Sequence, residues 1–292
     1  MRDGFVKVAA GTPKIRVADC DYNAGQIIAL MREAAAQGVK VLALPELCVT
    51  GYTCGDLFLQ PTLLDGAERA LGRILEETRE LDMLTALGMP VRNEDHKLYN
   101  CAAVLLRGEL LGLVPKSHIP NYGEFYEGRW FASGRTCNEA VRLCGGWVDL
   151  SPRRLFSCSA LRELTVGIEI CEDLWAAASP AAALAQAGAT LMLNLSASDE
   201  VAGKADYRRS LVTGQSARCL CAYVYAAAGE GESSPHLVFA GHNMIAENGA
   251  LLAETRLGTG LTVSEIDVQR LSHERRRMNT FAAGADEAVT IY

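Results

Sequence analysis

The chain has 292 residues, of which 49% are hydrophobic, so it can bury a large core. Its formal net charge of −7 excludes a general nucleic-acid binder, which would need a basic surface. Residues 1–4 (MRDG) lack the pattern of a secretory signal, and the 10 cysteines follow neither a disulfide framework nor a metal-type spacing. No apolar stretch is long enough for a membrane span. We therefore expect a globular, cytoplasmic protein with mostly buried thiols, no metal site and no membrane or nucleic-acid partner.

Strand-like and helix-like segments alternate through the first half of the chain. Strands are predicted at residues 5–10, 39–44 and 84–90, and helices at residues 19–38 and 61–81. Two further apolar runs, 99–106 and 110–115, flank Arg107-Gly108-Glu109 and are typical of a hairpin. Residues 116–135 contain Pro120, Gly123, Gly128 and Gly134, and this content of turn residues indicates irregular structure.

The same alternation returns after residue 160. Strands are predicted at residues 165–170, 190–195, 222–227 and 261–266, and helices at 180–187, 204–220 and 267–277. Asn248-Gly249 lies between two apolar runs, which is a strong hairpin signal. No repeat or linker divides the chain, and neither a G-x-G-x-x-G nor a P-loop pattern is present. The pattern indicates one α/β domain with both alternating elements and hairpins.

Three of the predicted strands end at residues of catalytic type. Glu46, Lys116 and Cys171 each follow directly, or within two residues, the end of a strand. Strand carboxyl ends are where α/β sheets collect catalytic groups. If the three converge, the carboxylate would take the thiol proton and the ammonium would hold the oxyanion of an acyl transfer. Taken singly, each also has an ordinary interpretation, as a buried thiol, a loop carboxylate or a surface lysine.

The motifs around these residues resemble those of the nitrilase, or carbon–nitrogen hydrolase, superfamily, and they occur in that family's order. They are residues 44–52 (LPELCVTGY), 115–120 (PKSHIP) and 167–175 (GIEICEDLW). Other segments are similar to the N-terminal glutaminase domain of glutamine-dependent NAD(+) synthetases: 50–58 (TGYTCGDLF), 121–127 (NYGEFYE), 194–198 (NLSAS), 215–218 (QSAR), 222–225 (AYVY) and 241–249 (GHNMIAENG). The resemblance spans about the whole chain and implies an α/β fold, the nitrilase-type four-layer α-β-β-α sandwich.

The resemblance also implies a division of the chain and a set of catalytic roles. Residues 1–270 would form the hydrolase domain, and residues 271–292 a helix end and tail that lead toward a synthetase domain absent from this sequence. Glu46 would deprotonate Cys171 and later activate water, while Lys116 would stabilise the oxyanion. Glu124 would orient Lys116, with Glu127 as the nearest alternative.

L-glutamine is the substrate that this resemblance implies, and its α-amino and α-carboxylate groups would each need a partner. Glu172 would bind the amino group, and its backbone N–H would support the oxyanion. Lys204 would bind the carboxylate, although a lysine lacks the two-pronged contact of an arginine. Tyr52 would line the site or the exit for ammonia. The implied substrate-binding set is Tyr52, Tyr122, Phe125, Glu172, Trp175, Ser198 and Lys204; ordinary core packing is the alternative for Tyr122, Phe125 and Trp175.

Glu169 is an acid inside an otherwise apolar strand. Alternation along that strand places it on the same face as Cys171, two residues later. We expect it to support the site through a buried partner.

The implied reaction is hydrolysis of glutamine to glutamate and ammonia, without a metal or an organic cofactor. Ammonia would pass to a synthetase domain, in cis or within a homo-oligomer, that uses ATP, Mg²⁺ and deamido-NAD. One alternative is a stand-alone amidase of the same superfamily acting on another small amide, which would not need Glu172, Ser198 and Lys204. A non-catalytic scaffold domain is a second alternative, and the intact set of three catalytic residues argues against it.

Overall fold

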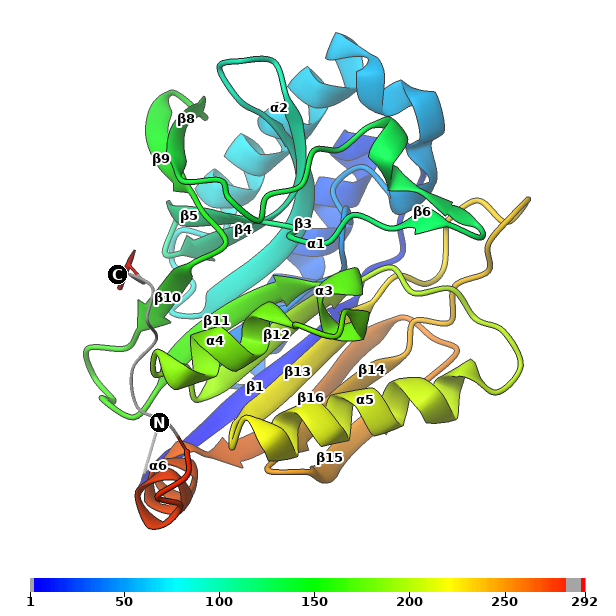
Figure 1. Cartoon of the computed structure of the whole chain (residues 1–292). Coiled ribbons are helices and arrows are strands. Elements are labelled where there is room, and N and C mark those ends of the chain that lie inside the picture. Colours follow the sequence, from blue (N-terminus) through cyan, green and yellow to red (C-terminus); the bar gives the residue numbers. More distant parts are fainter. Residues whose placement is uncertain (1–2, 282–289, 292) are drawn as a thin grey trace.

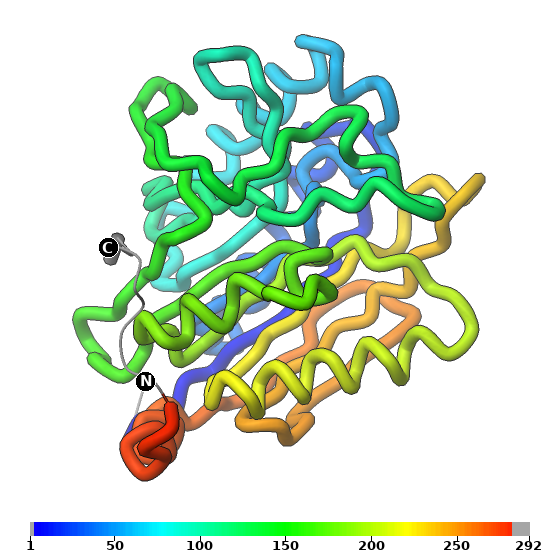
Figure 2. Tube along the Cα trace, in the orientation of Figure 1, coloured from blue at the N-terminus to red at the C-terminus, as the bar shows by residue number. Residues whose placement is uncertain are grey.

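Two β-sheets lie face to face, with helices on both outer sides, in the computed structural model, which describes residues 3–281 and 290–291 (Figure 1, Figure 2). The eight-stranded sheet has the order β16-β1-β2-β3-β4-β5-β9-β8. Its strands are β1 (Phe5–Thr12), β2 (Val41–Ala43), β3 (Leu84–Arg92), β4 (Leu98–Leu106), β5 (Glu109–Pro115), β8 (Glu139–Leu143), β9 (Gly146–Leu150) and β16 (Gly260–Asp267).

The second sheet has seven strands in the order β15-β14-β13-β12-β11-β10-β17. They are β10 (Arg154–Ser157), β11 (Thr165–Ile170), β12 (Leu191–Ser196), β13 (Ala222–Ala227), β14 (Asn243–Glu247), β15 (Ala250–Thr255) and β17 (Thr290–Ile291). Strands β6 (Asn121–Tyr122) and β7 (Phe125–Tyr126) form a small separate hairpin. Both large sheets combine parallel neighbours, such as β1-β2-β3 and β11-β12-β13, with antiparallel hairpins.

Helices cover the two outer faces. Figure 1 shows α4 and α5 over the second sheet and α1 and α2 on the opposite side of the molecule. The helices are α1 (Cys20–Ala36), α2 (Pro61–Glu77), α3 (Glu172–Trp175), α4 (Pro180–Gln186), α5 (Lys204–Arg218) and α6 (Val268–Arg277), with 3₁₀ turns η1 (Tyr52–Leu59) and η2 (Glu127–Arg129). None of the helices in the described ranges is long and apolar enough to cross a membrane.

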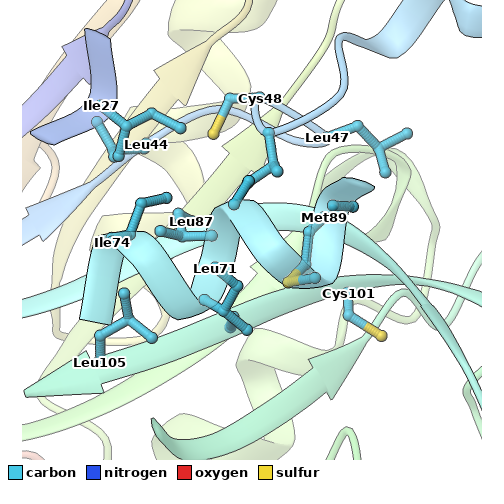
Figure 3. Close-up of a cluster of buried hydrophobic side chains, with 14 of the residues drawn as sticks. Ile27, Leu44, Leu47, Cys48, Leu71, Ile74, Leu87, Met89, Cys101 and Leu105 are labelled. Atoms are coloured by element: carbon cyan, nitrogen blue, oxygen red, sulfur yellow. The ribbon is translucent and has the colours of Figure 1, made fainter. Parts of the chain in front are cut away.

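Three apolar clusters fill the spaces between these layers. One lies between the first sheet and its helices, where Leu71 of α2 is packed near Leu87 of β3 (Figure 3). A second lies between the sheets and contains Val8 of β1 and Val224 of β13. The third lies under α4 and α5 and contains Val212. Because strand side chains alternate, each sheet supplies two clusters, and the predicted four-layer α-β-β-α sandwich is confirmed.

Local sequence explains where the main helices begin. The Asp19 carboxylate accepts a hydrogen bond from the Tyr22 N–H at 3.1 Å and caps α1. Pro61 occupies the first turn of α2, where its fixed φ suits a helix start and no N–H is needed. The Asp267 carboxylate caps α6 in the same way as Asp19 caps α1. Each of these starts lies within two residues of its predicted position.

The pattern analysis missed six strands, namely β8, β9 and β10 and the two-residue strands β6, β7 and β17. The hairpin β8–β9 lies at the edge of its sheet and exposes alternate residues, including Trp147, which is 68% exposed. Strands of four or five residues at an edge carry too short an apolar run to be distinguished from loops.

The predicted domain boundary at residue 270 falls inside α6, which continues to Arg277. Leu271 is fully buried in the cluster between the sheets, and Arg275 donates hydrogen bonds to the carbonyl groups of Cys219 and Leu220. α6 is therefore part of the same folded unit. Most of the predicted tail, residues 282–289 and 292, lies outside the described residues.

Gly88 of β3 faces the segment that carries Glu46. A Cβ atom at this position would lie 2.2 Å from the Leu47 nitrogen and 2.5 Å from the Pro45 oxygen. Because both are backbone atoms, Gly88→Ala is expected to destabilise the fold by about 1–3 kcal/mol and to lower the Tm by several degrees. Thermal melts against Gly214→Ala, whose Cβ would meet nothing within 4 Å, measure the effect; equal Tm values would contradict it.

Candidate active site

Cys171 marks an abrupt turn from β11 into α3. Its φ is 44° and its ψ is −99°, an uncommon conformation for a residue with a side chain. The Cys171 N–H donates a hydrogen bond to the Leu195 carbonyl at 3.0 Å, and its own carbonyl accepts one from Leu174. The thiol is therefore held rigidly at the strand end, and only 7% of the residue is exposed.

The Lys116 ammonium lies between two buried carboxylates. Its Nζ donates to Glu46 Oε1 at 2.6 Å and to the two oxygens of Glu127 at 2.7 and 2.9 Å. Side-chain exposure is 0% for Lys116 and Glu46 and 2% for Glu127. Asn100 of β4 also donates to Glu46 Oε1, at 2.7 Å. The other oxygen of Glu46, Oε2, is buried and has no hydrogen-bond partner among the described residues.

The carboxylate that orients Lys116 is therefore that of Glu127, and the prediction of Glu124 is wrong. Glu124 lies in the turn of the β6–β7 hairpin and is exposed. The chain then turns back through η2, where the Glu127 N–H donates to the Pro120 carbonyl at 3.1 Å. This turn directs Glu127 inward, and the Tyr52 hydroxyl donates to its Oε1 at 2.8 Å. This contact places Tyr52 next to Glu127, and its role in the site wall or in the exit for ammonia stays a prediction.

Electrostatics in the buried cluster favour a neutral thiol beside a charged lysine. Burial disfavours the Lys116 ammonium, but the charges of Glu127 and Glu46 outweigh it and raise the pKa of Lys116 well above its usual range. Burial, followed by the negative charge of Glu46, raises the pKa of the Cys171 thiol, which Lys116 opposes. Burial also raises the pKa of Glu127. Since these charges act on Cys171, the three predicted catalytic residues do converge.

The predicted substrate-binding residues form a second group beside the thiol. The Tyr122 hydroxyl donates to Glu172 Oε1 at 2.8 Å, and the Tyr122 and Phe125 rings are 6.4 Å apart in an edge-on arrangement. Lys204 Nζ lies 5.5 Å from the centre of the Phe125 ring and 5.3 Å from that of Trp175. These contacts connect five of the predicted residues, namely Tyr122, Phe125, Glu172, Trp175 and Lys204.

Lys204 already has a partner. Its ammonium forms an ion pair with Asp199, a buried residue of the loop that leads into α5. Asp199 therefore fixes the lysine between the two aromatic rings, a contact that no pattern in the sequence indicated.

Arg208 is a further residue that the sequence analysis missed. Its guanidinium donates to Ser198 Oγ at 3.1 Å and to the Asp199 carbonyl at 2.8 Å, and it contacts His242 Nδ1 at 2.8 Å. The predicted site residue Ser198 is thus held by a fully buried arginine. The spacing of residues along the helix could have indicated its burial, because Arg208 lies on the same face of α5 as the buried residues Ala205 and Val212.

A hollow adjoins this group, and its lining includes Tyr52, Phe125 and Trp130. Glu124 lies on its rim, so this residue stays near the site although it does not contact Lys116. The half-buried Glu232 carboxylate accepts hydrogen bonds from the Tyr52 N–H at 2.7 Å and from Thr53, and so holds the wall that carries Tyr52.

Glu169 lies on the opposite face of β11 from the position predicted for it. Its carboxylate accepts from Ser179 Oγ at 2.6 Å, from the Ala181 N–H at 3.0 Å and from the Tyr223 hydroxyl, all on the α4 side of the sheet. Cys171 packs instead in the cluster between the sheets. Strand alternation fails here because the backbone has already left the strand at Cys171.

Comparisons with known proteins agree with this architecture. The carbon-nitrogen hydrolase family model matches residues 7–276. A glutamine-dependent NAD(+) synthetase from Mycobacterium tuberculosis is 43% identical over 281 residues, covering 95% of this chain and 41% of the relative. One from Aquifex aeolicus is 32% identical over 231 residues, covering 78% of this chain and 36% of the relative. The chain thus spans about two-fifths of the length of these relatives, 41% and 36%.

Solved structures show the same relationship. A glutamine-dependent NAD(+) synthetase from Cytophaga hutchinsonii matches with a TM-score of 0.80 and 29% identity, covering 91% of this chain and 43% of that one. An amidase from Nesterenkonia sp. matches in fold, with a TM-score of 0.72 and 20% identity, covering 95% of this chain and 96% of that one. The architecture is therefore that of the nitrilase superfamily. The chain belongs to the carbon–nitrogen hydrolase family and is a carbon–nitrogen hydrolase.

Glu127→Gln tests which carboxylate orients Lys116. The variant keeps the side-chain volume but leaves the ammonium with one carboxylate partner, so kcat for amide hydrolysis is expected to fall about 100-fold. Glu124→Gln, in the exposed turn, is the matched control and is expected to lower kcat less than about threefold. Steady-state rates of ammonia release measure both. A larger loss for Glu124→Gln would restore the original prediction.

Glu169→Gln tests a charge buried behind the site. Burial raises the pKa of Glu169 to about 7, so the folded protein holds a proton that the unfolded chain releases near pH 4–5. The stability of the folded protein therefore falls as pH rises from the unfolded pKa to the folded pKa. The amide of Gln can accept from Ser179 and donate to Tyr223 without ionising. The stability of the variant relative to the parent is therefore expected to increase by about 1–3 kcal/mol from pH 5 to pH 8, and the difference between their Tm values is expected to increase with it. Thermal melts that show a constant difference would contradict this assignment.

Proposed function

We propose that this chain hydrolyses L-glutamine to glutamate and ammonia, with Cys171 as the nucleophile, Glu46 as the base and Lys116 as the oxyanion-stabilising group. One observation carries the proposal. A buried ammonium is shared by two carboxylates next to a buried thiol, and the base still has a free oxygen. Groups so costly to bury are retained where they take part in chemistry.

The first half-reaction begins with transfer of the Cys171 proton to Oε2 of Glu46. The sulfur then attacks the side-chain carbonyl carbon of glutamine, and the Lys116 ammonium and the Glu172 N–H stabilise the oxyanion that forms. Collapse of the intermediate breaks the carbon–nitrogen bond. Glu46 returns the proton to the leaving nitrogen, so that ammonia departs and a thioester remains on Cys171.

The second half-reaction uses the same groups. Glu46 takes a proton from water, and the resulting hydroxide attacks the thioester carbonyl, again with Lys116 at the oxyanion. Collapse breaks the carbon–sulfur bond, releases glutamate and returns the proton to Cys171. Carboxylate, ammonium and thiol supply the base, the charge stabilisation and the nucleophile, so we expect this half of the activity to need neither a metal nor an organic cofactor.

Recognition of the amino-acid end would fall to the second group of residues. Glu172, held by Tyr122, offers a carboxylate for the α-amino group. Lys204 offers an ammonium for the α-carboxylate, at the aromatic wall formed by Phe125 and Trp175. The ion pair of Lys204 with Asp199 spares the lysine the cost of an unpaired charge before substrate binds.

The relatives suggest where the ammonia would be used. The chain spans 41% of relatives named glutamine-dependent NAD(+) synthetase, which supports a role as the ammonia-producing part of such an enzyme. ATP, Mg²⁺ and deamido-NAD would then be used by a synthetase domain, in cis or within a homo-oligomer. Glutamine hydrolysis by Cys171 and Glu46 would consume none of these reactants, so it is the activity to assay first.

A substrate comparison tests the proposal. The protein is expected to release glutamate from L-glutamine with a kcat/KM at least about 100-fold above that for propionamide, which lacks both α-groups. Cys171→Ala is expected to abolish the activity, and an electrophilic glutamine analogue is expected to add its mass at Cys171.

Three outcomes would overturn parts of this account. Persistent glutamine hydrolysis by Cys171→Ala removes the nucleophile assignment. Labelling at Cys48 or Cys54, both buried elsewhere in the first sheet's cluster, redirects it. A preference for propionamide over glutamine identifies the chain as an amidase for another small amide.

A further inference from the structure

Asp173, two residues after the thiol, makes contacts with both catalytic loops. Its Oδ1 accepts from the His118 N–H at 2.8 Å and lies 2.9 Å from the His118 ring nitrogen Nδ1. Its Oδ2 accepts from the Ile170 N–H at 3.0 Å and from the Ser117 N–H at 3.3 Å. The side chain is almost completely buried, and both of its oxygens are occupied.

These donors belong to the two segments whose separation matters for the chemistry. Ser117 and His118 directly follow Lys116, at the end of a strand of the first sheet. Ile170 directly precedes Cys171, at the end of a strand of the second sheet. One carboxylate therefore joins the end of β5 to the end of β11 across the sandwich. A charged acceptor in a buried position makes such hydrogen bonds stronger than those between neutral groups.

The His118 ring adds a titratable contact to this link. Its side chain is 25% exposed, and the charged groups that face it are Asp173 and Glu172, which attract a proton, and Arg135, which repels one. The hydrogen bond that the His118 ring donates to the Asp173 carboxylate raises the pKa of His118 above its usual value. The ion pair is therefore complete at low pH and loses its charge as pH rises through that raised pKa, although a neutral ring can still donate its Nδ1 proton.

We propose that Asp173 is a positioning residue that fixes the Lys116 ammonium relative to the Cys171 thiol, and that protonation of His118 strengthens this link. The proposal rests on the roles of Lys116 and Cys171 in the proposed function. Asp173 does not touch the reacting atoms; it acts through the two backbones that it joins.

The consequence for reactivity follows from charge. Lys116 is the positive group that opposes the rise in the Cys171 pKa caused by burial and Glu46. Loosening the link between the two strand ends would weaken that opposition, so less thiolate would form at a given pH. Thiolate formation can be followed without any substrate, by alkylation with iodoacetamide.

The first experiment measures alkylation of Cys171 by peptide mass spectrometry between pH 6 and pH 9. Asp173→Asn keeps the volume but turns an N–H₂ group toward backbone N–H donors, so the rate is expected to fall about tenfold and its increase with pH to be displaced toward higher pH. The exposed Cys144 in the same sample is an internal control for reagent and pH. Asp267→Asn, which loses a carboxylate cap far from the site, is the matched variant and is expected to alkylate within about twofold of the parent.

The second experiment uses His118, whose replacement is less disruptive. His118→Gln keeps a donor but cannot titrate, so the alkylation rate of the parent divided by that of this variant is expected to exceed one at pH 6 and to approach one at pH 9. His118→Phe loses the donor and is expected to be about threefold slower than His118→Gln at pH 9.

An unchanged rate and an unchanged pH dependence in folded Asp173→Asn would overturn the proposal. Where that variant does not fold, equal rates for the parent, His118→Gln and His118→Phe at every pH would overturn it instead. Alkylation at Cys171 in a parent that does not hydrolyse glutamine would refute the proposed substrate and leave this test in force.

Discussion

Burial of the Lys116 ammonium is the constraint on which the rest of the site depends. An ammonium taken out of water costs several kcal/mol unless charge and hydrogen bonds replace the lost solvent. Here Glu46 and Glu127 supply three short acceptor contacts to the Lys116 Nζ. Two carboxylates thus compensate the buried ammonium, and loss of either would leave that charge less well compensated.

The direct and indirect hydrogen-bond partners of Lys116 come from four other parts of the chain. Glu46 follows β2, Lys116 follows β5, Glu127 lies in η2, and Asn100 of β4 holds Glu46 from the side. Tyr52 of η1 then holds Glu127. The first sheet brings the strand ends together, and the loops supply the remaining partners. Cys171 comes from the second sheet, so the sandwich itself sets the distance between the proposed nucleophile and the proposed base.

The sequence allowed the architecture and the three converging residues to be predicted, because these depend on apolar periodicity and on dense motifs at strand ends. Contacts that depend on the path of a loop were not accessible in the same way. The choice between Glu124 and Glu127 turns on three residues of hairpin and 3₁₀ turn, for which periodicity carries no information. The face of Glu169 was assigned by alternation, which stops at the strained Cys171. Arg208 was accessible in principle, since its helical phase is that of buried neighbours.

The arrangement around Lys116 also explains why the site is poised for proton transfer. Two carboxylates face one ammonium, and all the donors that reach Glu46 bind its Oε1. The other oxygen is buried without a donor among the described residues, a state that costs about 1–3 kcal/mol. The nearby thiol has its pKa raised by burial and by the charge of Glu46. Moving the proton from sulfur to Oε2 satisfies the free oxygen and removes the charge of Glu46 that disfavours a thiolate, while Lys116 offsets part of the cost of burying that thiolate. The unpaired oxygen of Glu46 is thus the acceptor that the first step of the proposed reaction needs.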